Sequence, residues 1–496
     1  MKKISITFYI TLVAVALAVG YGVIAPKQFE GVTTSAKNFI ADSFGWYYLL
    51  IVSMLFFISI FLIFSPIGRI RLGKDHDRPQ FSMISWLAML FSAGMGIGLV
   101  FYGAAEPLSH YAVDPATAAP ETKAAYKEAM RETFFHWGFH AWAVYGMTAL
   151  TLAYFQFRKG QTGLISVTLR PIFGDRVDGR LGIVIDGFAI FATVFGVATS
   201  LGFGAVQINA GLHYLFGIPV GFVSQLAIIA IVTVLFLISA WSGLGKGIKI
   251  LSNTNMVLAL ALLLFIIALG PTLLIFNMFT DSIGGYLENL IRMSFRTAPL
   301  TPENRVWLND WTLFYWAWWM AWSPFVGMFI ARVSKGRTIR EFMIGVLVVP
   351  TVLSAVWFAA FGTTAIETQR AGIIDLASTA TELTIFEMFS GLPWSSFISG
   401  IAILLIISFF ITSADSATFV LGMQSSYGSL TPPNNLKIIW GVIQSSIAVI
   451  LLFVGGLDAL QNVIIIAALP FSIILIMMVV SLFKSLKEER KKIKRP

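Results

Sequence analysis

Apolar residues in this chain form long uninterrupted blocks, without the short polar–apolar periods of helices and strands that have one face in water. The blocks run about 20 residues, the helix length that crosses a bilayer core of roughly 30 Å. Because no polar face remains, the pattern predicts membrane-spanning helices. We expect twelve of them, over residues 4–24, 46–66, 83–105, 133–156, 183–209, 218–241, 253–277, 311–331, 342–362, 396–420, 437–456 and 462–483.

Three of the connections between these blocks are long. They cover Glu106–Glu132, Phe279–Asp310 and Thr363–Ser395, and we place them on the outer side. The second one repeats apolar residues at i, i+4, i+7 and i+8, which predicts an amphipathic helix. Such a helix either lies on the outer membrane interface or packs over the bundle. Its apolar positions are Ile283, Leu287, Leu290 and Ile291.

Two of the predicted spans carry residues that weaken a helix. The third contains Gly94, Gly96 and Gly98, and the eighth contains Pro324 after Trp322-Ser323. Glycine clusters and proline weaken the hydrogen-bond ladder, which membranes tolerate where backbone lines a cavity or a ligand. We therefore expect both helices to be interrupted. For the glycines, close helix packing is the alternative explanation.

The two expected interruptions lie five spans apart, as in transporters built from inverted repeats. The sequence then divides into two leading helices (1–82), a first five-helix repeat (83–277), an external amphipathic segment (278–310), a second repeat (311–483) and a basic tail (484–496). The predicted class is an all-α integral membrane protein of twelve transmembrane helices. Hydropathy and break positions support the repeat, since the halves show no clear identity.

Composition excludes a soluble protein, because 57% of the 496 residues are hydrophobic and only 12% are charged. The net charge of +9 follows from topology. On one side of the twelve spans lie 25 of the 34 Lys and Arg residues, so both termini are expected in the cytoplasm. We therefore expect no nucleic-acid partner. The amino-terminal apolar run Ile4–Ile24 is too long for a typical signal peptide, and we expect it to be retained.

The eighth span carries an aromatic stripe at i, i+3, i+4 and i+7, which lies on one helix face. Its members are Tyr315, Trp318, Trp319 and Trp322, and the fourth span adds Trp137, Trp142 and Tyr145. Indole faces attract quaternary ammonium groups, which cannot donate hydrogen bonds. The stripe therefore predicts an aromatic box for such a cation. The alternative is core packing combined with an interfacial tryptophan belt.

Acidic residues are scarce in the apolar spans. Asp415 is the clearest, while Asp186 lies near an entry and Glu106 near an exit. A transporter of a bare metal ion or an amine needs a carboxylate at its site. We therefore expect a zwitterion, with its ammonium in the aromatic box and its carboxylate on freed backbone N–H groups around Gly98.

Three runs of residues closely resemble the betaine–carnitine–choline transporter family: Gly94–Leu99, Phe135–Trp142 and Trp318–Gly327. The resemblance extends over essentially the whole chain. It implies the sodium-symporter inverted-repeat fold with two extra leading helices, and a homotrimer. The substrate residues it implies, together with the stripe, are Trp137, Trp142, Tyr145, Trp318, Trp319, Trp322, Gly94, Met95, Gly96 and Gly98.

Within that family, glycine at position 98 is similar to the betaine-type members, whereas aspartate there accompanies choline. The tenth span resembles the sodium-coupled members. The resemblance implies one Na⁺ on the carbonyls of Ser92, Met95 and Phe409 and the hydroxyls of Thr412 and Ser413. Interhelical hydrogen bonding is the alternative role for the two hydroxyls.

A second sodium site is less complete. Thr193 and Phe325 match the family, but Val197 replaces an expected threonine. His136 and His140 have metal-ligand spacing, yet no third ligand is obvious, and polar packing explains them better. The short tail has seven basic residues, which either bind anionic lipid and sense osmotic state or only set the topology.

Together these features predict a transporter in the bacterial cytoplasmic membrane that imports glycine betaine with Na⁺ for osmotic protection. A related solute (choline, carnitine, ectoine or proline) is the nearer alternative, with exchange as another mode. A membrane-embedded enzyme needs a nucleophile–base pair or a metal cluster, and without cysteine only the two histidines are candidates. We therefore expect no enzymatic activity and no organic cofactor.

Overall fold

The structure is a computed structural model that describes residues 4–94, 96–242 and 247–493. Throughout these residues the regular elements are helices, and the single paired β-bridge joins Arg71 to Thr338. The α-helices are α1 (Ile6–Ile24), α2 (Pro26–Phe64), α3 (Met83–Gly94), α4 (Ile97–Leu108), α5 (Lys123–Trp137), α6 (Phe139–Ala153), α7 (Arg170–Phe173), α8 (Arg180–Phe216), α9 (Phe222–Ser242), α10 (Gly247–Leu269), α11 (Thr272–Ser294), α12 (Pro302–Leu308), α13 (Phe314–Val333), α14 (Ile339–Arg370), α15 (Thr384–Ser390), α16 (Ser395–Gln424) and α17 (Asn434–Ile493).

Eight helices of the described chain are long and apolar enough to cross a membrane: α1, α2, α8, α9, α10, α14, α16 and α17. The prediction of an all-helical membrane protein is therefore confirmed. The last two predicted spans form the single element α17, which is kinked at Gly455 and Gly456. Gly456 has φ 59°, a left-handed conformation that glycine adopts without steric cost.

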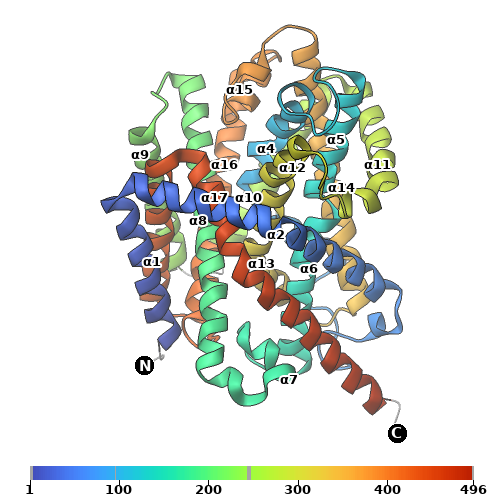
Figure 1. The fold of residues 1–496 in the computed structure, drawn as a ribbon, viewed down its shortest axis with the longest axis vertical. Coiled ribbons are helices and arrows are strands. Elements are labelled where there is room, and N and C mark those ends of the chain that lie inside the picture. Colours follow the sequence, from blue (N-terminus) through green and yellow to red (C-terminus); the bar gives the residue numbers. More distant parts are fainter. Residues whose placement is uncertain (1–3, 95, 243–246, 494–496) are drawn as a thin grey trace.

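Figure 1 shows the helices as an upright bundle in which the two ends of the chain lie toward the same end of the molecule. The short helices α12 and α15, together with α5 and α11, gather at the opposite end. In the interior, α13 packs against α6 and α8, and α4 packs against α14. The helices around α13 therefore bring distant parts of the chain together.

The third predicted span is interrupted, as expected. Helix α3 ends at Gly94 and α4 begins at Ile97, with Gly96 in an extended conformation between them. Met95 lies outside the described residues. The interruption leaves the amino end of α4 inside the bundle, where Ile97 and Gly98 are buried.

The prediction that the eighth span is interrupted at Pro324 is wrong. Helix α13 continues through this proline from Phe314 to Val333. Proline has no N–H, so the carbonyl of Met320 loses its helical donor. The hydroxyl of Ser323 donates to that carbonyl at 2.9 Å and satisfies it. The helix therefore has a local replacement for its missing bond.

A break that the sequence pattern did not reveal divides the fourth predicted span. Helix α5 ends at Trp137 and α6 begins at Phe139, with Gly138 between them at φ −97° and ψ −140°. The hydroxyl of Tyr286 accepts a hydrogen bond of 3.1 Å from the N–H of Phe139. This second interruption therefore lies beside Trp137, a residue predicted for the aromatic box.

Tyr286 belongs to α11, which contains the four apolar positions of the predicted amphipathic helix. Tyr286 and Met293 are buried against the bundle, whereas Leu287 and Ile291 are exposed. Helix α11 thus packs over the bundle and still presents apolar residues outward, so the two interpretations of its pattern are compatible.

Several predicted boundaries are wrong. The seventh span, predicted to reach residue 277, ends with α10 at Leu269, and α11 begins at Thr272. Helix α2 begins at Pro26, whereas the prediction began near residue 46. The prediction missed the first half of the helix because that half is polar and carries Lys37, which pairs with Asp310 at 2.8 Å. The predicted loop Glu106–Glu132 is mostly helical, since α4 reaches Leu108, a π-helix follows over Ser109–Val113 and α5 begins at Lys123. Polar residues concealed both segments from a reading based on hydropathy.

Candidate substrate site

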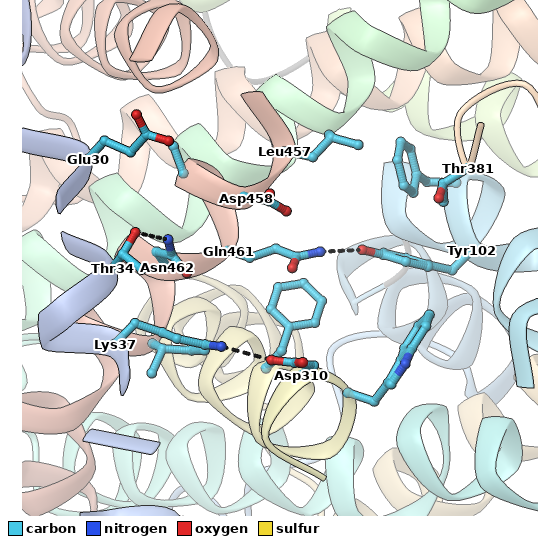
Figure 2. Close-up of a pocket in the computed structure, with 15 residues that line it drawn as sticks. Glu30, Thr34, Lys37, Tyr102, Asp310, Thr381, Leu457, Asp458, Gln461 and Asn462 are labelled. Carbon is cyan, nitrogen blue, oxygen red and sulfur yellow. Dashed lines mark hydrogen bonds and ion pairs between the residues drawn. The ribbon is translucent and has the colours of Figure 1, made fainter. Parts of the chain in front are cut away.

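A cavity of about 620 Å³ opens between α2, α4, the amino end of α13 and the kinked part of α17 (Figure 2). Polar groups line one side of the cavity, where Lys37 pairs with Asp310 and Asn462 Nδ2 donates to Thr34 Oγ1 at 3.2 Å. Tyr102 also lines the cavity, and its ring centroid lies 6.1 Å from that of Trp318. The cavity therefore reaches the layer of rings that covers the predicted aromatic box.

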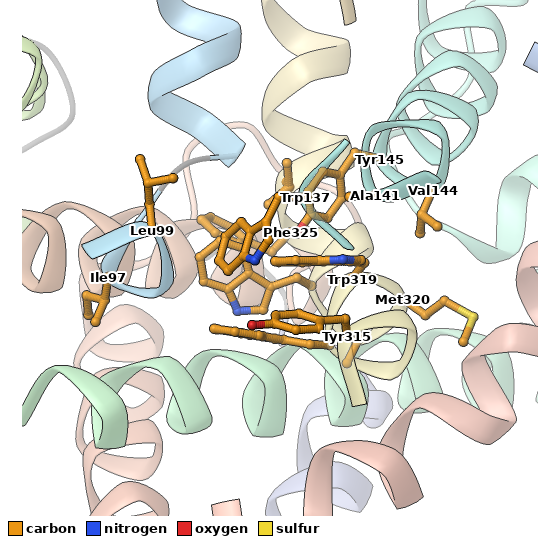
Figure 3. Close-up of a cluster of buried hydrophobic side chains, with 14 of the residues drawn as sticks. Ile97, Leu99, Trp137, Ala141, Val144, Tyr145, Tyr315, Trp319, Met320 and Phe325 are labelled. Carbon is orange, nitrogen blue, oxygen red and sulfur yellow. The ribbon is translucent and has the colours of Figure 1, made fainter. Parts of the chain in front are cut away.

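The aromatic stripe of α13 lies inside the protein. Its side chains are at most 4% exposed, so they do not face lipid. Trp318 and Trp319 stack with centroids 5.1 Å apart and planes at 9°, and Tyr315 stacks on Trp319 at 5.7 Å. Figure 3 shows Tyr315 and Trp319 as nearly parallel plates in the buried cluster.

The rings from the fourth predicted span meet this stripe. Trp137, at the end of α5, lies edge-on to Trp319 with centroids 4.9 Å apart. Tyr145 on α6 lies 6.0 Å from Trp319 and 5.6 Å from Trp142. The structure thus brings together the aromatic residues that the sequence analysis placed in one box.

The glycines of the interrupted span face these rings. A Cβ atom on Gly98 would lie 2.5 Å from Cη2 of Trp318, and one on Gly94 would lie 2.6 Å from Cζ3 of Trp142. At Gly96 the nearest atom would be Cη2 of Trp322, at 3.3 Å. Each glycine therefore lets a different indole approach bare backbone, which explains the cluster better than general helix packing.

Hydrogen bonds at the ring edges fix the indoles. Trp322 Nε1 donates to the carbonyl of Gly196 on α8 at 2.9 Å, and Trp319 Nε1 donates to the carbonyl of His136 at 3.0 Å. Trp318 Nε1 lies 3.3 Å from Ser200 Oγ. Because each edge is bound to a neighbouring helix, the faces of the rings keep defined orientations.

The expectation that the box has no nearby carboxylate is wrong. Glu106 lies in α4 and is fully buried. Its Oε2 accepts hydrogen bonds from Trp137 Nε1 at 2.7 Å and from the Tyr315 hydroxyl at 2.5 Å. Its Oε1 lies 2.7 Å from His136 Nδ1. The error came from placing Glu106 at the outer end of its span.

The sequence does contain a signal for Glu106. Gly98, Tyr102, Glu106 and His110 are spaced at four-residue intervals, so they share one helix face. A helix that turns Gly98 toward the box therefore turns Glu106 toward it as well. The other two acidic residues lie elsewhere: Asp186 accepts from Ser166, and Asp415 from Ser239.

The two histidines with metal-ligand spacing have different partners. His136 contacts Glu106 and, through Nε2, Thr312 Oγ1 at 2.9 Å, whereas His140 Nε2 lies 2.9 Å from Ser294 Oγ. Ligand atoms of Glu106, His110 and His136 do lie within 4.8 Å of one another, which is close enough to hold a metal ion. However, Glu106 and His136 are already hydrogen-bonded to each other.

The residues predicted for Na⁺ lie mainly on α16, beside the interrupted span. Phe409 and Thr412 are buried, and Ser413 Oγ lies 3.7 Å from the Cβ position of Gly96. Ser92 belongs to α3, and Met95 lies outside the described residues. The hydroxyl of Thr412 donates to a carbonyl of its own helix, at 2.9 Å from Ser408 O.

Asn255 on α10 is a neighbour that the sequence analysis did not identify. Its Nδ2 donates to Thr412 Oγ1 at 3.0 Å, while its buried Oδ1 has no hydrogen-bond partner among the residues that the structure describes. An unpaired buried oxygen beside the predicted cation ligands is itself a suitable ligand type for a hard cation. No motif or spacing in the sequence marks Asn255 as a site residue.

The second predicted set is split between two helices. Thr193 lies on α8, where its hydroxyl donates to the carbonyl of Ala189 at 2.8 Å, and Phe325 lies on α13. Val197 is buried on α8, where a threonine was expected. Close packing of Gly196 against Trp322 places the two helices side by side.

Long apolar helices around a buried aromatic cluster, with a cavity leading to an interrupted helix, define a multi-pass membrane transporter of small solutes. A family model described as "BCCT, betaine/carnitine/choline family transporter" matches residues 6–491. The chain belongs to this betaine/carnitine/choline transporter family, and it is therefore a transporter and not an enzyme.

Similar proteins of known description include transporters for two kinds of solute. The chain is 60% identical to the glycine betaine transporter OpuD of Bacillus subtilis (strain 168), covering 100% of this chain and 97% of that protein. It is 42% identical to the ectoine/hydroxyectoine transporter of Virgibacillus pantothenticus, over 98% and 97% of the two chains. A probable glycine betaine transporter of Desulfitobacterium hafniense (strain Y51) is also 42% identical, over 98% of each chain.

Proposed function

We propose that this transporter imports glycine betaine together with Na⁺ and so serves osmotic protection. The observation that carries the proposal is the meeting of Trp137, Trp318 and Trp319 beside the glycines of the interrupted span. The similarity to a glycine betaine transporter over the full chain supports the same solute. Family membership and the similarity to a glycine betaine transporter support transport of a betaine-like solute, and the coupling ion and physiological role are the finer steps of this proposal.

The trimethylammonium group of the substrate would lie among the indole faces of the aromatic box. Each face contributes about 0.5–2 kcal/mol of attraction to a cation that has lost its water. The substrate carboxylate would be bound at the amino end of α4, where Ile97 and Gly98 present backbone N–H groups and the helix dipole favours negative charge.

One Na⁺ would be bound between the interrupted span and α16, on Ser92, Met95, Phe409, Thr412 and Ser413. The 3.7 Å between Ser413 Oγ and the Cβ position of Gly96 supports this placement, because it brings α16 next to the interruption. The ion would favour the arrangement of the interrupted span in which the glycines face the box, and this is how its binding would assist substrate binding. Thr193 and Phe325 would contribute to a second ion, with one oxygen fewer because of Val197.

The proposed architecture has twelve spans in two inverted five-helix repeats. The first repeat would begin at α3 and end with α10, and the second would begin at α13 and end with α17. Because α13 is continuous, matched interruptions do not support the repeat, which rests on the order of spans and the family resemblance. The charge distribution supports cytoplasmic termini in a bacterial cytoplasmic membrane. A homotrimer and contacts of the basic tail with anionic lipid complete the proposal.

Uptake of labelled glycine betaine into proteoliposomes tests the function. We expect uptake that requires an inward Na⁺ gradient, and equal uptake without the gradient would contradict the coupling. Competition by unlabelled ectoine, choline, carnitine and proline tests the solute. Ectoine is the alternative with specific support, because a relative that is 42% identical over almost the whole chain is described as an ectoine/hydroxyectoine transporter.

A further inference from the structure

We propose that Glu106 is a buried counter-charge of the aromatic box. Its carboxylate fixes two rings by their polar edges and adds the negative charge that makes the box prefer a cation to an uncharged group of the same shape. This inference rests on the proposed function, because it concerns how the same box recognises trimethylammonium. In it Glu106 is a positioning residue, which acts through Trp137 and Tyr315.

The hydrogen bonds around Glu106 indicate an ionised carboxylate. An indole N–H can only donate, and the Tyr315 hydroxyl donates to the same atom at 2.5 Å, so Oε2 accepts two hydrogen bonds, as an ionised carboxylate oxygen does. On the other side, a neutral His136 that donates from Nδ1 to Oε1 and accepts at Nε2 from Thr312 satisfies both of its contacts. Three donors therefore converge on the two oxygens.

No lysine or arginine of the described chain forms an ion pair with this carboxylate. The side chains of His136 and His110 lie beside it, and Nε2 of His110 is 3.4 Å from Oε1. Arg296 packs over the ring of Trp307 and is bound by Glu132 through two contacts of 2.8 and 2.9 Å. A buried charge that lacks a strong cation is costly in a membrane protein, and such residues usually serve a functional site.

The location of the charge gives it a specific effect on the rings. A carboxylate at the N–H edge of Trp137 and the O–H edge of Tyr315 increases the negative potential of their faces, which is the property that attracts a cation. The surrounding protein screens this charge weakly because Glu106 has no exposed surface. The same charge repels the substrate carboxylate, and so it favours the orientation in which that group lies toward the amino end of α4.

A purely architectural role predicts something different. Glu106 joins α4, α5 and α13, so its loss could loosen the box without any electrostatic effect. Loosening would weaken the binding of every ligand that fills the box. Loss of the charge would weaken the binding only of a ligand that carries a positive charge there.

The test compares glycine betaine with 3,3-dimethylbutanoate, in which an uncharged carbon replaces the quaternary nitrogen and the shape is retained. Binding of each to the purified full-length protein is measured by quenching of tryptophan fluorescence. We expect Glu106→Gln to raise the Kd for glycine betaine about tenfold. The Kd for 3,3-dimethylbutanoate should stay the same or fall, because the lost charge also repelled the carboxylate of that ligand. Glu106→Asp, which retains the charge, should restore part of the preference.

Equal losses for the two ligands would overturn the proposal in favour of an architectural role, and unchanged glycine betaine binding would overturn it as well. Tyr315→Phe keeps the ring but removes the hydroxyl on Oε2, so it should also reduce the preference, and it serves if Glu106→Gln does not fold. Glu128→Gln is the matched control, because Glu128 is a buried carboxylate on α5 that binds Thr117 instead of the box. A wild-type protein that does not bind glycine betaine would refute the proposed function. A wild-type protein that binds glycine betaine and 3,3-dimethylbutanoate equally well would refute only this inference.

Discussion

The hydroxyl of Ser323 donates a hydrogen bond of 2.9 Å to the carbonyl of Met320, the group that Pro324 leaves without its helical donor. This bond lies in the part of α13 that carries the aromatic stripe. It keeps the helix continuous where a proline normally kinks or ends one, and so holds the four stripe residues in register.

The dependence of this bond on the proline can be measured by a double-mutant cycle. Ser323→Ala should lower stability by about 1–3 kcal/mol, because it leaves a buried carbonyl unpaired. In a Pro324→Ala background the residue at 324 supplies the N–H, and the same serine substitution should cost little. Thermal unfolding of the four purified proteins in detergent gives the comparison. A serine effect of equal size in both backgrounds would contradict this role.

Trp319 contacts four other rings of the box, since it stacks on Trp318 and Tyr315 and meets Trp137 and Tyr145. Trp319→Ala should therefore reduce glycine betaine affinity about thirtyfold while the protein still folds and inserts, because one desolvated cation–π face of about 2 kcal/mol is lost. Binding and uptake are compared with Trp241→Ala, which removes an exposed indole on α9. Unchanged transport would remove the aromatic box from the mechanism.

Gly98 has no space for a side chain, because an added Cβ would lie 2.5 Å from Trp318 and 3.1 Å from Trp137. Gly98→Ala should displace these rings and strongly reduce substrate affinity. Gly284→Ala on α11 is the control, since nothing lies within 4 Å of its Cβ position. Measured Kd values that are equal for the two variants would mean that the packing of glycine against indole has no role in binding.

Substitution of Thr412 should weaken Na⁺ binding more than it weakens substrate binding. Thr412→Ala removes a predicted ligand and the partner of Asn255 Nδ2, so the Na⁺ concentration for half-maximal uptake should rise several-fold at saturating substrate. Thr254→Ala removes an exposed hydroxyl of α10 that bonds only within its own helix. The sodium dependence of the control should match the wild type. If Thr412→Ala matches it too, this hydroxyl is not an ion ligand.

Much of the fold follows from hydropathy, because an apolar block of about 20 residues has few stable arrangements other than a membrane-spanning helix. The predicted helix boundaries are wrong where polar residues continue a helix, as in the first half of α2. The predicted interruption at Gly96 is present, because glycine has no Cβ and adopts a non-helical backbone conformation at little cost. The predicted interruption at Pro324 is absent, because a neighbouring hydroxyl replaces the missing donor.

The sequence by itself determined the membrane class, the stripe of rings on α13 and the glycines of the interrupted span, because each depends on residues close together along one helix. Only the tertiary structure decided that Glu106 belongs beside Trp137 and that Asn255 reaches Thr412. These contacts join helices far apart in the chain. A single sequence contains local periodicity, but it does not contain the rotation and depth at which one helix packs against another, and those two quantities determine which polar atoms meet.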